Sequence, residues 1–200
     1  MRFKQGHQAG FTISELLIVI AITGVVAATA LPGITRTMAD FRLRGDARSL
    51  HNLLGVAKMR AAAKYTKTRV YVDLTTKTFY LQTWDKPTNT WVTEGATTSL
   101  STNVDFAFDA LATPPPFTQP ALQQAVDCLD DAGADIANTA CVVFNSRGIP
   151  IDPTTGNPDG NGGFYLTDHT TGVYGITISM TPLVRLWWTA LSNDGGWVQK

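Results

Sequence analysis

The sequence predicts an α+β fold in which one long N-terminal helix packs on an antiparallel β-sheet. Three observations lead to this prediction: residues 12–65 read as one long helix, several later segments alternate with a period of two, and no helical segments alternate with those strands. A run of strands without β-α-β alternation is typical of an antiparallel sheet with its helix on one face.

The helix is expected over about residues 12–65, half of it apolar and half amphipathic. Its amphipathic half has apolar residues at three- and four-residue steps, with slips near Gly45. These apolar positions are Ile34, Met38, Phe41, Ala47, Leu50, Leu54, Ala57 and Ala61. Such a stripe needs a sheet to cover it, because an isolated amphipathic helix has nothing to bury its apolar face against.

The strands are expected where β-branched and aromatic residues alternate with polar ones. The expected strands are residues 68–74, 78–84, 103–108, 141–145, 163–167, 174–180 and 183–188. Residues 121–137 read as a short acidic helix or a loop, and residues 148–163 as a turn-rich loop.

The charges balance overall but are separated along the chain. The 200 residues hold 16 Lys and Arg and 16 Asp and Glu. Residues 34–69 hold nine basic and two acidic residues, whereas residues 73–200 hold five basic and thirteen acidic ones. A basic stretch after an apolar segment suits acidic lipid or an acidic partner, but a solvated helix face is the simpler interpretation.

The amino-terminal end combines a short basic stretch with a long apolar run. Residues 1–10 carry Arg2 and Lys4, and residues 11–34 contain a single charge, Glu15. At about 1.5 Å per residue, this run spans roughly 36 Å as a helix, which exceeds a hydrocarbon core of about 30 Å. The positive flank stays cytoplasmic, so the later residues are expected on the periplasmic side.

Three interpretations of this segment compete. A secretory signal peptide would be cut after Ala28-Thr29-Ala30, but Pro32 would then follow the cut and Glu15 would lie at the entry to the apolar run. A plain single-span anchor leaves Glu15 unexplained, since a carboxylate near the helix centre costs about 2.5–3.5 kcal/mol. The third interpretation supplies a partner for this carboxylate.

The run Gly10-Phe11-Thr12-Ile13-Ser14-Glu15 resembles the class III leader of type IV pilins and type II secretion pseudopilins. The resemblance implies that a membrane prepilin peptidase cleaves the Gly10–Phe11 bond and N-methylates Phe11. It also implies that Glu15 pairs with the terminal amine of a neighbouring subunit in a filament, and that Pro32 kinks the helix. Ser14 departs from the bulkier residue common in the family.

This resemblance divides the chain into four parts. Residues 1–10 are the cleaved leader, 11–34 the transmembrane helix in the bacterial inner membrane, 35–67 its amphipathic continuation and 68–200 a periplasmic β-rich domain. Expected partners are other pilins or pseudopilins, the prepilin peptidase and methyltransferase, and inner-membrane lipid.

Two cysteines, Cys128 and Cys141, are separated by twelve residues. An exported protein tends to oxidise such a pair, whereas a cytosolic protein keeps free thiols. We expect a disulfide if the domain is exported, worth about 3 kcal/mol in the chain-entropy account of loop closure. Two buried thiols are the alternative.

Weaker patterns resemble the GspH/FimT-like branch of the pseudopilins. They are the helix at residues 43–69, the run Val143-Phe144-Asn145-Ser146-Arg147-Gly148, and residues 176–179 leading into 184–186. The resemblance implies a minor subunit near the tip of a secretion pseudopilus or a type IV pilus.

No catalytic, cofactor or metal motif is apparent, which argues against an enzyme. His7, His51 and His169 are isolated in the sequence, and the glycine-rich loop Asp152–Asp159 lacks the ligand spacing of an EF-hand. A solvated turn is the simpler interpretation of that loop.

The alternative function is DNA binding for uptake. Some FimT-like minor pilins bind DNA through arginines near their last strands, and here only Arg185 matches that pattern. A phosphate backbone usually needs several cations, and the surrounding half of the chain is acidic. Of Trp187 and Trp188, which alternate faces, one is expected to be exposed and, with Trp197, to form a subunit contact.

Overall fold

The computed structural model of the chain describes residues 11–200, except for the side chains of residues 29–33. It contains two compact units, Met1–Met38 and Ala39–Lys200. Residues 1–10, the expected leader with His7 and Gly10, lie outside the described residues.

One helix, α1 (Ile13–Lys64), matches the helix expected from the sequence. It ends in a Schellman arrangement: Tyr65 takes a left-handed φ of 52°, and the Thr66 N–H donates to the Ala61 carbonyl at 3.3 Å. The Lys86 ammonium donates to the Tyr65 carbonyl at 2.7 Å, which supplies a cation at the end of the helix where carbonyls are unpaired.

The buried stripe of α1 repeats every three or four residues. It consists of Leu43, Ala47, Leu50, Leu54, Ala57 and Ala61. The prediction was wrong at Ile34, Met38 and Phe41, which are exposed. Phe41 and Leu43 lie about 200° apart around a helix, so only one of them can face the core, and Leu43 does so.

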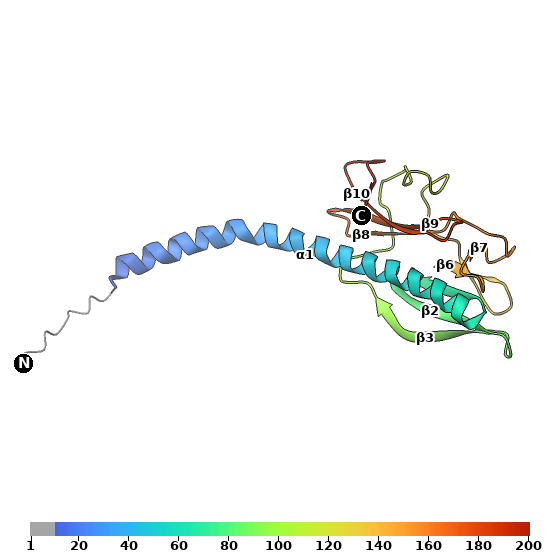
Figure 1. The fold of residues 1–200 in the computed structure, drawn as a ribbon. Coiled ribbons are helices and arrows are strands. Elements are labelled where there is room, and N and C mark those ends of the chain that lie inside the picture. Colours follow the sequence, from blue (N-terminus) through green and yellow to red (C-terminus); the bar gives the residue numbers. More distant parts are fainter. Residues whose placement is uncertain (1–10) are drawn as a thin grey trace, which may run out of the picture. The chain divides into compact units, whose positions relative to one another are not determined.

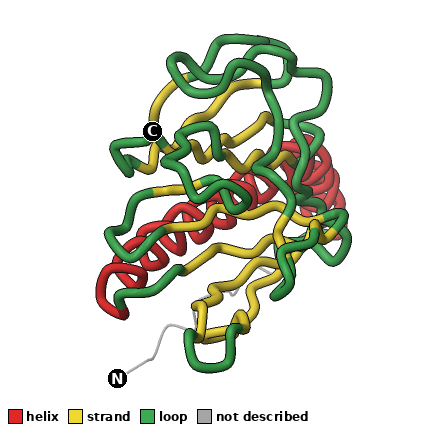
Figure 2. Tube along the Cα trace, turned by 90° about the vertical axis from the view of Figure 1, so that its right-hand side faces the viewer, coloured by secondary structure: helices red, strands yellow, loops and turns green. Residues whose placement is uncertain are grey.

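The strands of the second unit form two main antiparallel sheets and a short hairpin. The five-stranded sheet has the order β3 (Thr90–Ser99), β2 (Thr78–Asp85), β1 (Thr68–Asp73), β6 (Thr139–Phe144) and β7 (Pro150–Ile151). The four-stranded sheet has the order β11 (Val198–Gln199), β10 (Val184–Ala190), β9 (Gly172–Ile178) and β8 (Gly163–Thr167). The hairpin pairs β4 (Cys128–Leu129) with β5 (Asp135–Ile136). Figures 1 and 2 show these strands beside the second half of α1.

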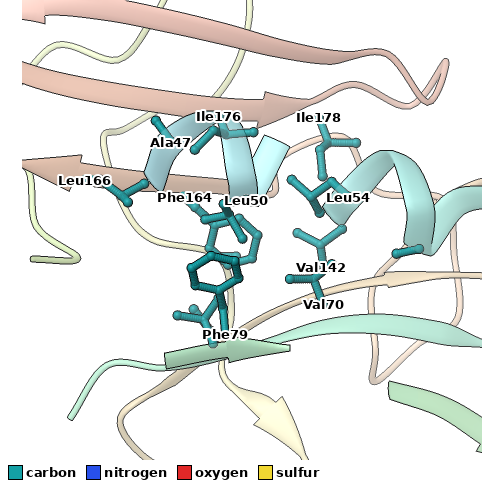
Figure 3. Packing of buried hydrophobic residues seen from close by; sticks show 14 of the residues in the cluster. Ala47, Leu50, Leu54, Val70, Phe79, Val142, Phe164, Leu166, Ile176 and Ile178 are labelled. Carbon is teal, nitrogen blue, oxygen red and sulfur yellow. The ribbon is translucent and has the colours of Figure 1, made fainter. Parts of the chain in front are cut away.

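The core of this unit lies where the buried stripe of α1 meets both sheets. Leu50 and Leu54 of α1 pack between Phe79 and Val70 of the five-stranded sheet and Ile176 of the four-stranded sheet (Figure 3). The expected α+β fold, with an N-terminal helix packed on antiparallel strands, is therefore confirmed.

Two strand expectations were wrong. Residues 103–108 form no strand: Asn103 and Asp109 take left-handed φ values of 66° and 50°, and only Asp105 makes an isolated bridge, to Thr167. The ten-residue edge strand β3 was missed because its side chains are mostly exposed, so it lacks a buried alternation. Residues 121–137 contain no helix and end in the β4–β5 hairpin.

Candidate functional site

The described chain begins with two residues outside the helix. Phe11 and Thr12 precede α1, and the Phe11 side chain is 90% exposed. The backbone that directly follows residue 10 is therefore non-helical, and Phe11 is accessible to solvent.

Thr12 and Glu15 form a reciprocal capping box at the start of α1. The Thr12 N–H donates to Glu15 Oε2 at 2.9 Å, and the Glu15 N–H donates to Thr12 Oγ1 at 3.3 Å. The Thr12 hydroxyl also donates to Glu15 Oε2 at 2.8 Å. This cap was not predicted, although the Thr-x-x-Glu spacing ahead of an apolar run is its sequence signature.

The apolar side chains after Glu15 point outward on all sides of α1. Leu16, Leu17, Ile18, Val19 and Ile20 are all exposed, as are several later residues. The Thr23 hydroxyl donates to the Val19 carbonyl at 2.9 Å, so the helix itself supplies its partner. Among the residues that the structure describes, no helix is both long and apolar enough to cross a membrane.

Pro32 lies inside α1 by its backbone, while its side chain is outside the described part of the chain. The helix kink at this position stays a prediction.

Cys128 and Cys141 are joined by a disulfide, with their Cα atoms 5.0 Å apart. The bond links β4 to β6, and both cysteines are buried. It holds the β4–β5 hairpin against the five-stranded sheet.

Arg185 stands on β10 opposite Thr177 of β9 and is half-buried. Lys200, the one basic residue that follows it in the sequence, lies with its Nζ 5.1 Å from the Trp188 ring centroid. The expectation of an exposed tryptophan pair is wrong. Trp197 is buried and donates from Nε1 to the Thr113 carbonyl at 2.7 Å, while Trp188 is half-buried.

His169 is not isolated, contrary to the sequence analysis. Its Nδ1 lies 2.6 Å from Asp109 Oδ1 and its Nε2 lies 2.9 Å from Asp105 Oδ2, while Lys77 pairs with the other oxygen of Asp105. Hydrogen bonds that the imidazole donates to the Asp105 and Asp109 carboxylates raise the pKa of His169. Hydrogen bonds from Lys77 and His169 lower the pKa of Asp105. The partners are some 60 residues away in sequence, so no local pattern indicates this network.

The loop Asp152–Asp159 is a set of turns closed by its own side chains. Asp152 Oδ1 accepts from the N–H groups of Thr154 and Thr155 at 3.0 and 2.6 Å. Among the described residues, no cluster of three or more ionisable side chains has the arrangement of a metal site.

Comparison with known proteins bears on the amino-terminal end. A family model described as the prokaryotic N-terminal methylation motif matches residues 6–31. The match spans the Gly10–Phe11 bond, the capping box and most of the apolar run. The chain therefore carries a prokaryotic N-terminal methylation motif at this end.

One solved structure similar to the chain is the minor pseudopilin EpsH from the type 2 secretion system of Vibrio cholerae. The two are 14% identical, with a TM-score of 0.45, over 76% of this chain and 99% of that chain. A search of curated proteins found no match.

Proposed function

We propose that the chain is a minor pseudopilin or pilin, a structural and assembly subunit of a type II secretion pseudopilus or a type IV pilus. The observation that carries this proposal is the methylation motif at residues 6–31, placed at the start of a helix that leads directly into a β-rich domain. The role is structural and involves no catalysis by this chain.

In this proposal, residues 1–10 are the leader, residues 11–34 anchor the subunit in the inner membrane, residues 35–67 continue the helix and residues 68–200 lie in the periplasm. The exposed apolar side chains after Glu15 support the anchor, because in water they would carry the full cost of apolar hydration. The disulfide between Cys128 and Cys141 supports export, since cytosolic thiols are kept reduced.

Processing follows from the motif. A prepilin peptidase cleaves between Gly10 and Phe11, and the new amine of Phe11 is methylated. The non-helical, exposed backbone at Phe11 and Thr12 supports this step, because a peptidase binds its substrate extended.

Assembly then joins this subunit to other pilins or pseudopilins through packed apolar helices. Glu15 pairs with the amine of a neighbouring Phe11, which neutralises a carboxylate that is costly to leave alone in an apolar environment. Membrane lipid is the partner before assembly.

Mass spectrometry of the mature N-terminus from purified membranes tests this proposal. The expected terminus is N-methylated Phe11. A Gly10→Val variant should remain uncleaved because the branched side chain crowds the scissile bond, whereas Gly6→Val, the same change elsewhere in the leader, should be cleaved normally. A mature chain that keeps residues 1–10, or that begins after Ala30, would refute the proposal.

A further inference from the structure

The outer face of the five-stranded sheet, opposite α1, carries an unusual set of side chains. On β1, Val70 and Val72 face α1 in the core, so Arg69 and Tyr71 point to the outer face. The strand register places Arg69 between Gln82 of β2 and Val143 of β6.

Arg69 is a buried cation held in a fixed position. Its side chain is almost fully buried, and it donates from Nε to Gln82 Oε1 at 2.8 Å and from Nη1 to the Leu129 carbonyl at 2.5 Å. Its guanidinium carbon lies 4.1 Å from the Trp91 ring centroid and 5.3 Å from that of Tyr71. Burial lowers the pKa of Arg69 to about 10, which leaves the group charged at neutral pH.

A cleft of about 200 Å³ opens beside this arginine, between the outer face and the β4–β5 hairpin. We call it the outer cleft and define it by Lys67, Arg69, Trp84, Trp91, Asp130 and Asp131. Trp84 and Trp91 pair across β2 and β3, with ring centroids 5.2 Å apart and an interplanar angle of 71°. The Lys67 ammonium lies 5.7 Å from the Trp84 centroid.

The wall of the outer cleft is preorganised. Asp131 accepts a hydrogen bond from the Trp91 N–H at 2.8 Å, which ties the hairpin to the edge strand. Asp130 accepts from the N–H groups of Ala132 and Ala134 at 2.9 and 2.8 Å, and the disulfide anchors the same hairpin at Cys128. A ligand would therefore find its polar partners already in place.

The charges of the outer cleft select a neutral ligand. Lys67 and Arg69 repel a cationic ligand, and Asp130 and Asp131 repel an anionic one. The four formal charges sum to zero. The two carboxylates can accept hydrogen bonds from a ligand and the Lys67 ammonium can donate them, whereas buried Arg69 contributes its charge. The indole rings offer flat apolar faces. A molecule with hydroxyl groups around its edge and a flat face of C–H groups satisfies all of these partners.

A second hollow shares Trp84 but is lined by Lys64 of α1 and by Glu94, so it lies on the α1 side of the sheet and does not extend the outer cleft. From the balanced charges and the two indole rings of the outer cleft we infer that it binds a neutral oligosaccharide, a property that does not depend on filament assembly.

Titration of the full-length chain tests this inference. The chain is kept in a detergent without a sugar headgroup, and maltohexaose and chitohexaose are added while tryptophan fluorescence and heat of binding are followed. We expect saturable binding of at least one of them at or below millimolar concentration. The two arms separate unsubstituted hexose from N-acetylhexosamine as the preferred unit.

Two tryptophan variants make the test specific. Trp84→Ala should weaken binding about tenfold or more, which corresponds to about 1.4 kcal/mol. Trp188→Ala is the matched control, because Trp188 is also half-buried beside a lysine but lies on the other sheet, and it should leave affinity unchanged. Thermal unfolding of both variants checks that they are folded.

Three results would overturn the inference. The first is the lack of saturable binding of either hexamer at millimolar concentration. The second is equal loss of affinity in both variants. The third is preferential binding of acidic oligogalacturonate or of a proline-rich peptide, since the balance of charges then would not select a neutral sugar.

Discussion

Thr12 and Glu15 hold each other through three hydrogen bonds at the first turn of α1, two of which join a backbone N–H to the other residue's side chain. The Glu15 carboxylate is thus oriented within its own chain before any partner arrives. The same bonds keep Thr12 and the residue before it outside the helix, next to the bond that the proposed peptidase cleaves.

Replacing Glu15 removes both the charge proposed to act in assembly and the Glu15 side chain of the cap. We expect Glu15→Ala to abolish or impair incorporation into filaments while membrane insertion continues, because removing one charge from the anchor favours insertion. Filament fractions and membrane fractions are compared by immunoblot, with Ser14→Ala as a neighbouring control. Normal assembly of Glu15→Ala would show that the carboxylate has no pairing partner.

Replacing Thr12 tests the cap alone. Thr12→Val keeps the shape of the side chain but loses the hydroxyl, and loss of such a cap costs about 1 kcal/mol of helix stability. We expect a partial reduction in filament yield, smaller than that of Glu15→Ala, and recovery in Thr12→Ser, which retains a hydroxyl. A Thr12→Ser chain as defective as Thr12→Val would contradict this role of the cap, because serine retains the capping hydroxyl.

The disulfide should stabilise the second unit measurably. In the chain-entropy account, a loop of this length contributes about 3 kcal/mol to the free energy of unfolding. The double variant Cys128→Ser with Cys141→Ser should therefore unfold at lower urea concentration than the oxidised chain. Wild type that has been unfolded and refolded with reductant is the control, and it should match the variant. Equal urea midpoints for the oxidised chain and the variant would contradict a stabilising crosslink.

Strands that bury at least one face could be predicted from the sequence. The exposed strand β3 and the irregular segment at residues 103–108 could not. Alternation at Val70 and Val72 identified β1. In contrast, β3 has no buried residue and contains Gly95 in a left-handed conformation, so its sequence shows no alternation of buried and exposed positions. At residues 103–108, Val104 is buried in the core, as an apolar residue of a strand would be. The backbone nevertheless turns at Asn103 and Asp109 and does not form a strand.

The candidate site residues also fall into a group that the sequence could predict and a group that it could not. Motifs that are read in one stretch of chain, such as Gly10 to Glu15, can be recognised without a structure. The outer cleft and the His169 network combine residues that are 60 positions apart, such as Arg69 with Leu129 and His169 with Asp109. Only the tertiary fold brings such residues together, and their local sequence contains no sign of it.

The His169 network should make stability depend on pH. The pKa of His169 is raised in the folded chain. Its contribution to the free energy of unfolding is therefore complete below the unfolded pKa of about 6.5 and is lost as pH rises through the folded pKa. Asp105, whose pKa is lowered, acts in the opposite direction and loses its contribution as pH falls through its folded value, below about 3.9.

The network is therefore expected to stabilise most between about pH 4 and pH 6.5. The difference in melting temperature between wild type and His169→Asn should be largest near pH 5.5 and should shrink toward pH 8. A difference that stays constant from pH 5 to pH 8 would rule out titration of His169 as its source.

Two glycines in the second unit should respond oppositely to the same substitution. A Cβ added at Gly172 would overlap the Thr189 carbonyl oxygen and lie 3.0 Å from Trp188 Nε1, whereas at Gly55 it would meet no atom within 4 Å. The carbonyl cannot move aside without disturbing the pairing of β9 with β10.

Gly172→Ala should therefore cost about 1–3 kcal/mol of stability, the usual effect of overpacking. Gly55→Ala should gain about 0.5–1 kcal/mol, because alanine loses less conformational freedom than glycine inside a helix. Urea unfolding of the two full-length variants, followed by circular dichroism, measures both changes. If Gly172→Ala were as stable as wild type, β9 and β10 would have to lie farther apart at Thr189 than they do in this structure.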